Sequence, residues 1–111
     1  MHLHEAIAKL SQWPEDAMIF ATRIGGEFRP ESEAVVIELS ESELRSPVRE
    51  VAARRAPGME YFLEVFVALE VVDGWRFNHP NQEPELEQIV ESIVYYAEHD
   101  AYPESFFGTR A

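Results

Sequence analysis

The amino-acid sequence predicts a single α+β domain, in which a small antiparallel sheet of two or three strands has helices packed on one face. Three observations support this prediction. Apolar residues recur at helical spacing near both ends of the chain, and two short runs between them have the composition of strands. The chain has 111 residues, which fits one domain, and 46% of them are apolar, which is enough for a packed core.

The N-terminal segment is expected to be a helix. Leu3, Ile7 and Leu10 recur at spacings of four and three, and Trp13 completes this apolar stripe. Pro14 should end the helix, because proline cannot donate the backbone hydrogen bond that a helix interior requires.

Two strands are expected next. Residues 17–22 form a short apolar run without charge, which is typical of a buried strand, and residues 33–39 are rich in β-branched side chains. The loop between them contains Gly25 and Gly26 and is longer than a tight hairpin turn. We therefore expect the two strands to pair antiparallel.

A second helix is expected to begin at Ser46 and Pro47, with the Ser46 side chain capping the free amide groups of the first turn. Two arginines fall in the last turn of this helix, where positive charge interacts favourably with the helix dipole. Just upstream, Ser40 and Glu43 have the spacing of a capping box.

Residues 59–72 allow two interpretations. Every odd position from 59 to 71 is apolar, and this alternation favours a strand. The segment is nevertheless long for a strand and ordinary in length for a helix. We prefer a strand that turns helical near its end, and a helix throughout is the alternative. Asp73 and Gly74 follow as a turn signal.

The last helix is expected over residues 84–98, where the helical periodicity is clearest. Its apolar face consists of Leu86, Ile89, Val90, Ile93, Val94 and Ala97. We expect the first five of these side chains to be buried. Residues 101–111 are expected to form a C-terminal tail.

The chain has a net charge of −12, which is unevenly distributed. Residues 1–55 carry seven basic and ten acidic side chains, whereas residues 56–111 carry two basic and eleven acidic ones. No lysine or arginine lies between Arg76 and Arg110. Because such a surface repels phosphate groups, direct binding of nucleic acid is disfavoured.

The sequence also bears on the cellular compartment. The N-terminus lacks the pattern of a signal peptide, and no apolar stretch approaches the roughly 18 residues of a membrane helix. The chain contains no cysteine, which excludes disulfides and thiolate catalysis. We therefore expect a cytoplasmic protein that does not bind membranes.

No residue pattern matches a catalytic, cofactor or metal site. His2 and His4 form a two-ligand pair at the terminus without a fixed third ligand. Glu60 and Glu64 share one face in either interpretation of their segment, and paired carboxylates can perform acid–base catalysis. A carboxylate-based enzyme is thus the least favoured alternative, and we expect no catalytic residue, no cofactor and no metal.

The function that we expect is a non-enzymatic acidic binding protein for a basic protein partner. In composition the chain is similar to small, cysteine-free immunity proteins and antitoxins, and no motif assigns it to a family. Five residues are candidate partner contacts: Glu87, Glu91, Glu98, Asp100 and Tyr96. The three glutamates lie outside the apolar stripe of the last helix and should be exposed. The alternative is a small homo-oligomer without catalysis, in which surplus apolar surface is buried between copies.

Because the sequence offers no four-ligand set, the tag-free protein should retain no stoichiometric metal after dialysis. Elemental analysis by plasma mass spectrometry is the measurement. Retained zinc, together with a melting temperature that falls when a chelator is added, would contradict this expectation.

Overall fold

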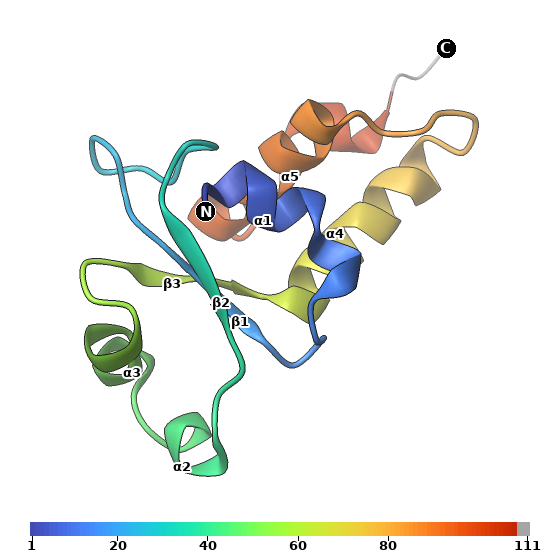
Figure 1. Cartoon of the computed structure of the whole chain (residues 1–111). Coiled ribbons are helices and arrows are strands. Elements are labelled where there is room, and N and C mark those ends of the chain that lie inside the picture. The colour runs from blue at the N-terminus through green and yellow to red at the C-terminus, as the bar shows by residue number, and fades with distance from the viewer. Residues whose placement is uncertain (109–111) are drawn as a thin grey trace.

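The central strand of the sheet, β1 (Met18–Ala21), is buried along its whole length. It pairs antiparallel with β2 (Ala34–Ile37) and with β3 (Glu60–Glu64), so the strand order is β2-β1-β3 (Figure 1). A strand with neighbours on both sides and helices on both faces has almost no contact with water, which explains why it contains no charge. This computed structural model describes residues 1–108, and it confirms the predicted α+β fold with an antiparallel sheet.

Helices pack on the sheet and on one another. Within residues 1–108 they are α1 (Leu3–Ala8), η1 (Leu10–Gln12), α2 (Glu41–Leu44), α3 (Val48–Arg55), α4 (Val65–Asn78), α5 (Leu86–His99) and η2 (Glu104–Phe107). The helices α1, α4 and α5 form the larger layer on one face, as predicted (Figure 1). No helix in this part of the chain is long and apolar enough to cross a membrane.

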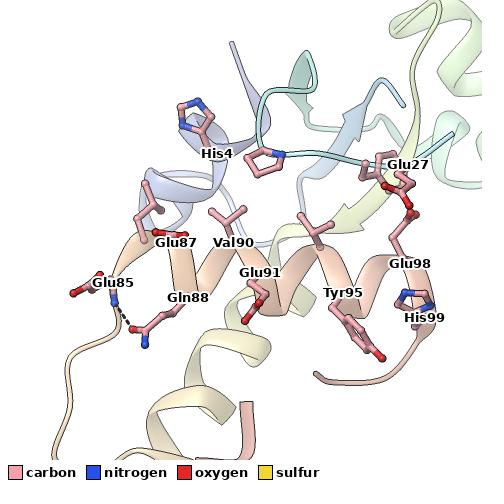
Figure 2. Close-up of a pocket in the computed structure, with 14 residues that line it drawn as sticks. His4, Glu27, Glu85, Glu87, Gln88, Val90, Glu91, Tyr95, Glu98 and His99 are labelled. Carbon is pink, nitrogen blue, oxygen red and sulfur yellow. Dashed lines mark hydrogen bonds between the residues drawn. The ribbon is translucent and has the colours of Figure 1, made fainter. Parts of the chain in front are cut away.

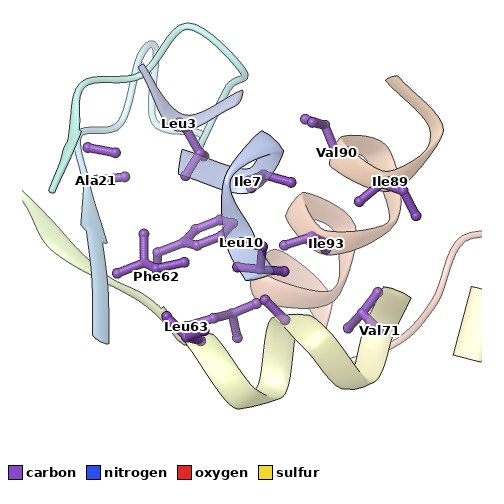
Figure 3. Close-up of a cluster of buried hydrophobic side chains, with 14 of the residues drawn as sticks. Leu3, Ile7, Leu10, Ala21, Phe62, Leu63, Val71, Ile89, Val90 and Ile93 are labelled. Atoms are coloured by element: carbon purple, nitrogen blue, oxygen red, sulfur yellow. The ribbon is translucent and has the colours of Figure 1, made fainter. Parts of the chain in front are cut away.

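Side chains of β1 alternate between two hydrophobic clusters, because successive residues of a strand point to opposite faces of the sheet. Ile19 and Ala21 belong to the larger cluster, together with side chains of α1, α4 and α5 (Figure 3). Met18 and Phe20 belong to a smaller cluster that includes Val51 of α3. The prediction of helices on one face therefore describes the larger layer, and α3 adds a second layer on the opposite face.

Residues 59–72 form both of the structures that the sequence allows, one after the other. They begin as β3 and continue as α4 from Val65, so the helix starts well before the end of the segment. The change occurs where the sheet ends, because the N–H groups of Val65 and Phe66 donate to the carbonyls of Ala17 and Glu15 at 2.9 and 3.1 Å. Beyond this point the apolar residues have helical spacing, and four of them are buried.

Asp73 and Gly74 do not form the predicted turn, because they lie inside α4. Gly74 is needed there for space, since a Cβ at this position would lie 2.7 Å from Cζ of Phe106. Phe106 is buried and belongs to η2, so part of the predicted tail packs against α4. The last three residues of that tail, 109–111, lie outside the described part of the chain.

The predicted capping box begins α2. The Ser40 side chain accepts a hydrogen bond from the N–H of Glu43, and the Glu43 carboxylate accepts one from the N–H of Ser40. Glu43 also accepts hydrogen bonds from Arg55 at 2.6 and 2.7 Å, which connect α2 to α3. These bonds, that from the Ser40 amide above all, lower the pKa of Glu43. Ser46 does not cap α3 as predicted, because its hydroxyl donates to the carbonyl of Ser42.

Helix α5 confirms most of its predicted buried face. Ile89, Val90 and Ile93 are buried, and Val94 is half-buried. Leu86 was expected to be buried as well, but it is 43% exposed. As the first residue of the helix, it lies beyond the residues that α1 and α4 cover, so the buried stripe starts one turn later.

Replacing Ile93 with Ala should lower the free energy of unfolding by about 2–5 kcal/mol, because it empties space in the centre of the larger cluster. Urea titration followed by circular dichroism measures the change. The control is Glu70→Ala at an exposed position of α4, which should change stability by no more than about 0.5 kcal/mol. Equal effects of the two substitutions would show that Ile93 is not a core residue.

Candidate functional site

A groove of about 840 Å³ lies between α5 and the segment that joins β1 to β2 (Figure 2). We call it the α5 groove. One wall is the exposed side of α5 from Glu85 to His99, and the other contains Phe28 and Pro30, with His4 of α1 beside them. Segments from the two ends of the chain therefore form one surface, which the sequence alone could not indicate.

The floor of the α5 groove is apolar. Leu86, Val90 and Val94 contribute from α5, where a spacing of four residues places them along one side of the helix. Phe28 and Pro30 face them from the opposite wall. Phe28 is held in place by an edge-on contact with a core aromatic ring, at 5.0 Å between ring centroids. Because Phe28 and Val90 are themselves buried, the accessible apolar surface of the groove comes from Leu86, Pro30 and Val94.

The rim of the α5 groove is acidic. Five glutamates border it: Glu27, Glu85, Glu87, Glu91 and Glu98. Two histidines, His4 and His99, are the basic side chains in its lining. Figure 2 shows Glu87 near the start of α5 and Glu91 one turn further along it, as their spacing of four residues predicts. An apolar floor with an acidic rim suits a ligand that is both apolar and cationic.

Arg23 joins three parts of the structure at one end of the groove. Its guanidinium donates to Glu98 of α5 at 2.8 Å and to Glu60 of β3 at 3.2 Å. The same group lies over the ring of Phe28, 4.1 Å from the centroid, in a cation–π contact. These contacts fix the wall of the groove against the helix that forms its other side.

Glu98 therefore differs from its prediction. We expected an exposed carboxylate without a basic neighbour, but its side chain is 17% exposed and is neutralised by Arg23. Proximity in sequence could not reveal this partner, because the two residues are 75 positions apart. Glu98 is better described as a support of the groove than as a free contact for a partner.

Glu87 and Glu91 remain as the acidic contacts that α5 offers. Both are exposed and line the groove. The Glu91 carboxylate accepts a hydrogen bond from the Ser105 hydroxyl at 2.8 Å, which leaves its charge in place. Two like charges four residues apart slightly destabilise a helix, so this pair has a small cost to folding.

Tyr96 and Asp100 lie outside the lining of the groove, although both were candidate contacts. Tyr96 is half-buried and packs against Tyr102, with 5.2 Å between ring centroids. Burial, and secondarily the charge of Asp100, raises the pKa of Tyr96. The aromatic residue that does line the groove is its neighbour Tyr95, whose ring lies 4.4 Å from that of His99. Its position one turn after Glu91 could have identified it from the sequence.

Glu60 and Glu64 do not form the paired carboxylates that the sequence allowed. An irregularity in the pairing of β1 with β3 shifts the register by one residue, so Glu60 lies opposite Ala21 and Glu64 opposite Met18. Those two β1 residues point to opposite faces of the sheet, and the glutamates therefore do so too. Glu64 instead accepts a hydrogen bond from the hydroxyl of Tyr61.

The described residues show no arrangement for metal chemistry. Within residues 1–108, no group of three histidine, aspartate or glutamate side chains could hold a metal ion. The two histidines of the groove have aromatic neighbours instead, since His4 stacks on His2 at 5.6 Å and His99 lies against Tyr95.

The ion pair of Arg23 with Glu98 should be energetically stronger than its pair with Glu60. Glu98 is 17% exposed and Glu60 is 61% exposed, so water weakens the second pair more. Double-mutant cycles of Arg23→Met with Glu98→Gln and with Glu60→Gln measure both coupling energies. We expect about 0.5–1 kcal/mol for Glu98 and less for Glu60. The reverse order would show that Arg23 supports β3 rather than the groove.

Comparisons of the chain with protein-family models, with curated proteins and with solved structures find no match, and the function has to be inferred from the groove itself.

Proposed function

We propose that this protein is a non-enzymatic binding protein, and that its α5 groove takes a basic, partly apolar segment of another protein. The observation that carries the proposal is the combination of an apolar floor with an acidic rim in one groove. A surface that only kept the protein soluble would need the charges but not the accessible Leu86 side chain and the half-buried Val94 side chain beside them.

The two parts of the groove contribute differently to binding. The floor, with Leu86 at 43% exposure, supplies apolar area that a partner can remove from water. Glu87 and Glu91 supply the attraction that accelerates association with a basic surface and selects against acidic ones. The net charge of −12 extends this attraction beyond the groove.

The specific form that we propose is an inhibitor or immunity protein for a basic enzyme, acting in the cytoplasm. Enzymes that act on nucleic acids have basic surfaces, because they bind phosphate. An acidic groove matches such a surface, whereas nucleic acid itself would be repelled. The similarity in composition to immunity proteins supports the same form.

Charge reversal in the groove tests this function. The immobilised wild-type protein, the variant Glu87→Lys/Glu91→Lys and the variant Glu15→Lys/Asp16→Lys are each exposed to native lysate at low and moderate salt. The second variant has the same change in net charge at exposed residues outside the groove. A partner that uses the groove should be retained by the wild type and by this control, and lost from the groove variant.

The partner, once purified, gives a quantitative measurement. Its association rate with the groove variant should fall and lose most of its dependence on salt, while the rate with the control variant changes much less. Circular dichroism verifies that both variants are folded. Equal retention and equal association rates for the three proteins would remove the α5 groove from the interface.

A further inference from the structure

The chain carries a second exposed surface, in which two arginines lie beside two aliphatic side chains. Leu44 ends α2 and Val48 begins α3, and their side chains are 63% and 39% exposed. Arg45 and Arg49, each adjacent in sequence to one of these residues, are exposed as well. We call these four residues the α2–α3 face.

The arginines of the α2–α3 face are weakly engaged within the chain. Arg45 makes an ion contact of 3.8 Å with Glu41, and both side chains are largely exposed, at 79% and 90%. Such a contact contributes little, because water screens it. Arg55 is different, since its guanidinium donates to the Glu43 carboxylate at 2.6 and 2.7 Å. The α2–α3 face is thus the part of the region that is free to contact another molecule.

The α2–α3 face and the α5 groove are complementary in kind. The face offers two aliphatic side chains beside two guanidinium groups, and the groove offers an apolar floor beside Glu87 and Glu91. Guanidinium groups are well suited to such a site, because they bind carboxylates with two parallel hydrogen bonds.

The two surfaces cannot meet within one chain. The helices α2 and α3 lie on the side of the sheet opposite α5, and the sheet and both hydrophobic clusters separate them (Figure 1). Any contact between these surfaces must therefore join two copies. A contact between unlike surfaces leaves one of each unused, so further copies can be added to form a ring or a short chain.

We infer that a second copy of this chain is an occupant of the α5 groove and that it binds through its α2–α3 face. This inference rests on the proposed function, in that the groove binds protein, and it names one partner. A second copy then competes with any basic partner for the same groove.

The overall charge determines the conditions of the test. Two copies of charge −12 repel each other at long range, whereas the arginine–glutamate pairs act at contact. At about 0.15 M salt the screening length is about 8 Å, which suppresses the long-range repulsion more than the contact pairs. Self-association should therefore be stronger at this ionic strength than at very low salt.

The experiment is a complementation of charge-reversed variants, followed by sedimentation velocity. The wild-type protein should exceed the monomer mass of 12.8 kDa increasingly as its concentration is raised. In Glu87→Lys/Glu91→Lys the rim of the groove carries positive instead of negative charge, and in Arg45→Glu/Arg49→Glu the α2–α3 face carries negative instead of positive charge. Each variant should remain monomeric alone, because its two surfaces then carry charges of the same sign. An equimolar mixture should associate again, because the intact groove of one variant meets the intact α2–α3 face of the other, and the two charge-reversed surfaces are also complementary to each other. Glu15→Lys/Asp16→Lys is the control and should associate like the wild type.

The inference is overturned if the wild-type protein is monomeric at every concentration, if either variant associates like the wild type, or if the mixture stays monomeric. Circular dichroism checks that the variants are folded, and the milder Glu87→Gln/Glu91→Gln and Arg45→Ala/Arg49→Ala replace any that is not. Failure of this inference is distinguishable from failure of the proposed function. Arg45→Glu/Arg49→Glu leaves the groove intact and should still retain a basic partner from lysate, whether or not copies associate.

Discussion

The burial of β1 is the constraint on which the rest of the structure depends. This four-residue strand has hydrogen-bonded neighbours on both edges and hydrophobic clusters on both faces. Because a strand that is buried in this way cannot contain a charge, the first charged residue after β1, Arg23, lies just beyond the end of the sheet. Arg23 reaches Glu60 of the neighbouring strand and Glu98 of α5 from that position. The end of the central strand thus determines where one wall of the groove lies.

The α5 groove exists because neighbouring elements bury only part of the apolar surface of α5. The helix has more apolar surface than its neighbours can bury, since Ile89 and Ile93 point into the core while Leu86 and Val94 stay partly accessible. Leaving apolar surface in water and placing Glu87 beside Glu91 both oppose folding slightly. Two such costs at the same place, next to a rigid wall, are typical of a surface that binds something.

Local patterns predicted the elements of the fold, and contacts between distant residues account for what they missed. The periodicity of residues 84–98 was sufficient for α5, and the spacing of Ser40 and Glu43 was sufficient for the cap of α2. The switch from β3 to α4 depends instead on where the sheet ends, and Gly74 inside α4 depends on Phe106, which packs against it from η2. A strongly local signal such as Asp73-Gly74 was misleading for the same reason.

The residues of the candidate site also divide into those that local spacing predicts and those that depend on contacts between distant parts of the chain. Glu87 and Glu91 could be identified from their spacing on one helix, because helical geometry alone places them together. The role of Glu98 could not, because its partner Arg23 is 75 positions away. The opposite wall, with Phe28 and Pro30, carries no signal of its own and becomes part of a site only when the chain folds against α5.

Basic and acidic residues that lie in different halves of the sequence also lie on different sides of the sheet. Most of the basic residues lie in the N-terminal half, and those of α2 and α3 are placed on one side of the sheet by the small cluster around Val51. The acidic helix α5 lies on the other side, held by the larger cluster. The sheet between them keeps the α2–α3 face away from the α5 groove within one chain, and a second copy of the chain is the one partner that is present wherever the protein is.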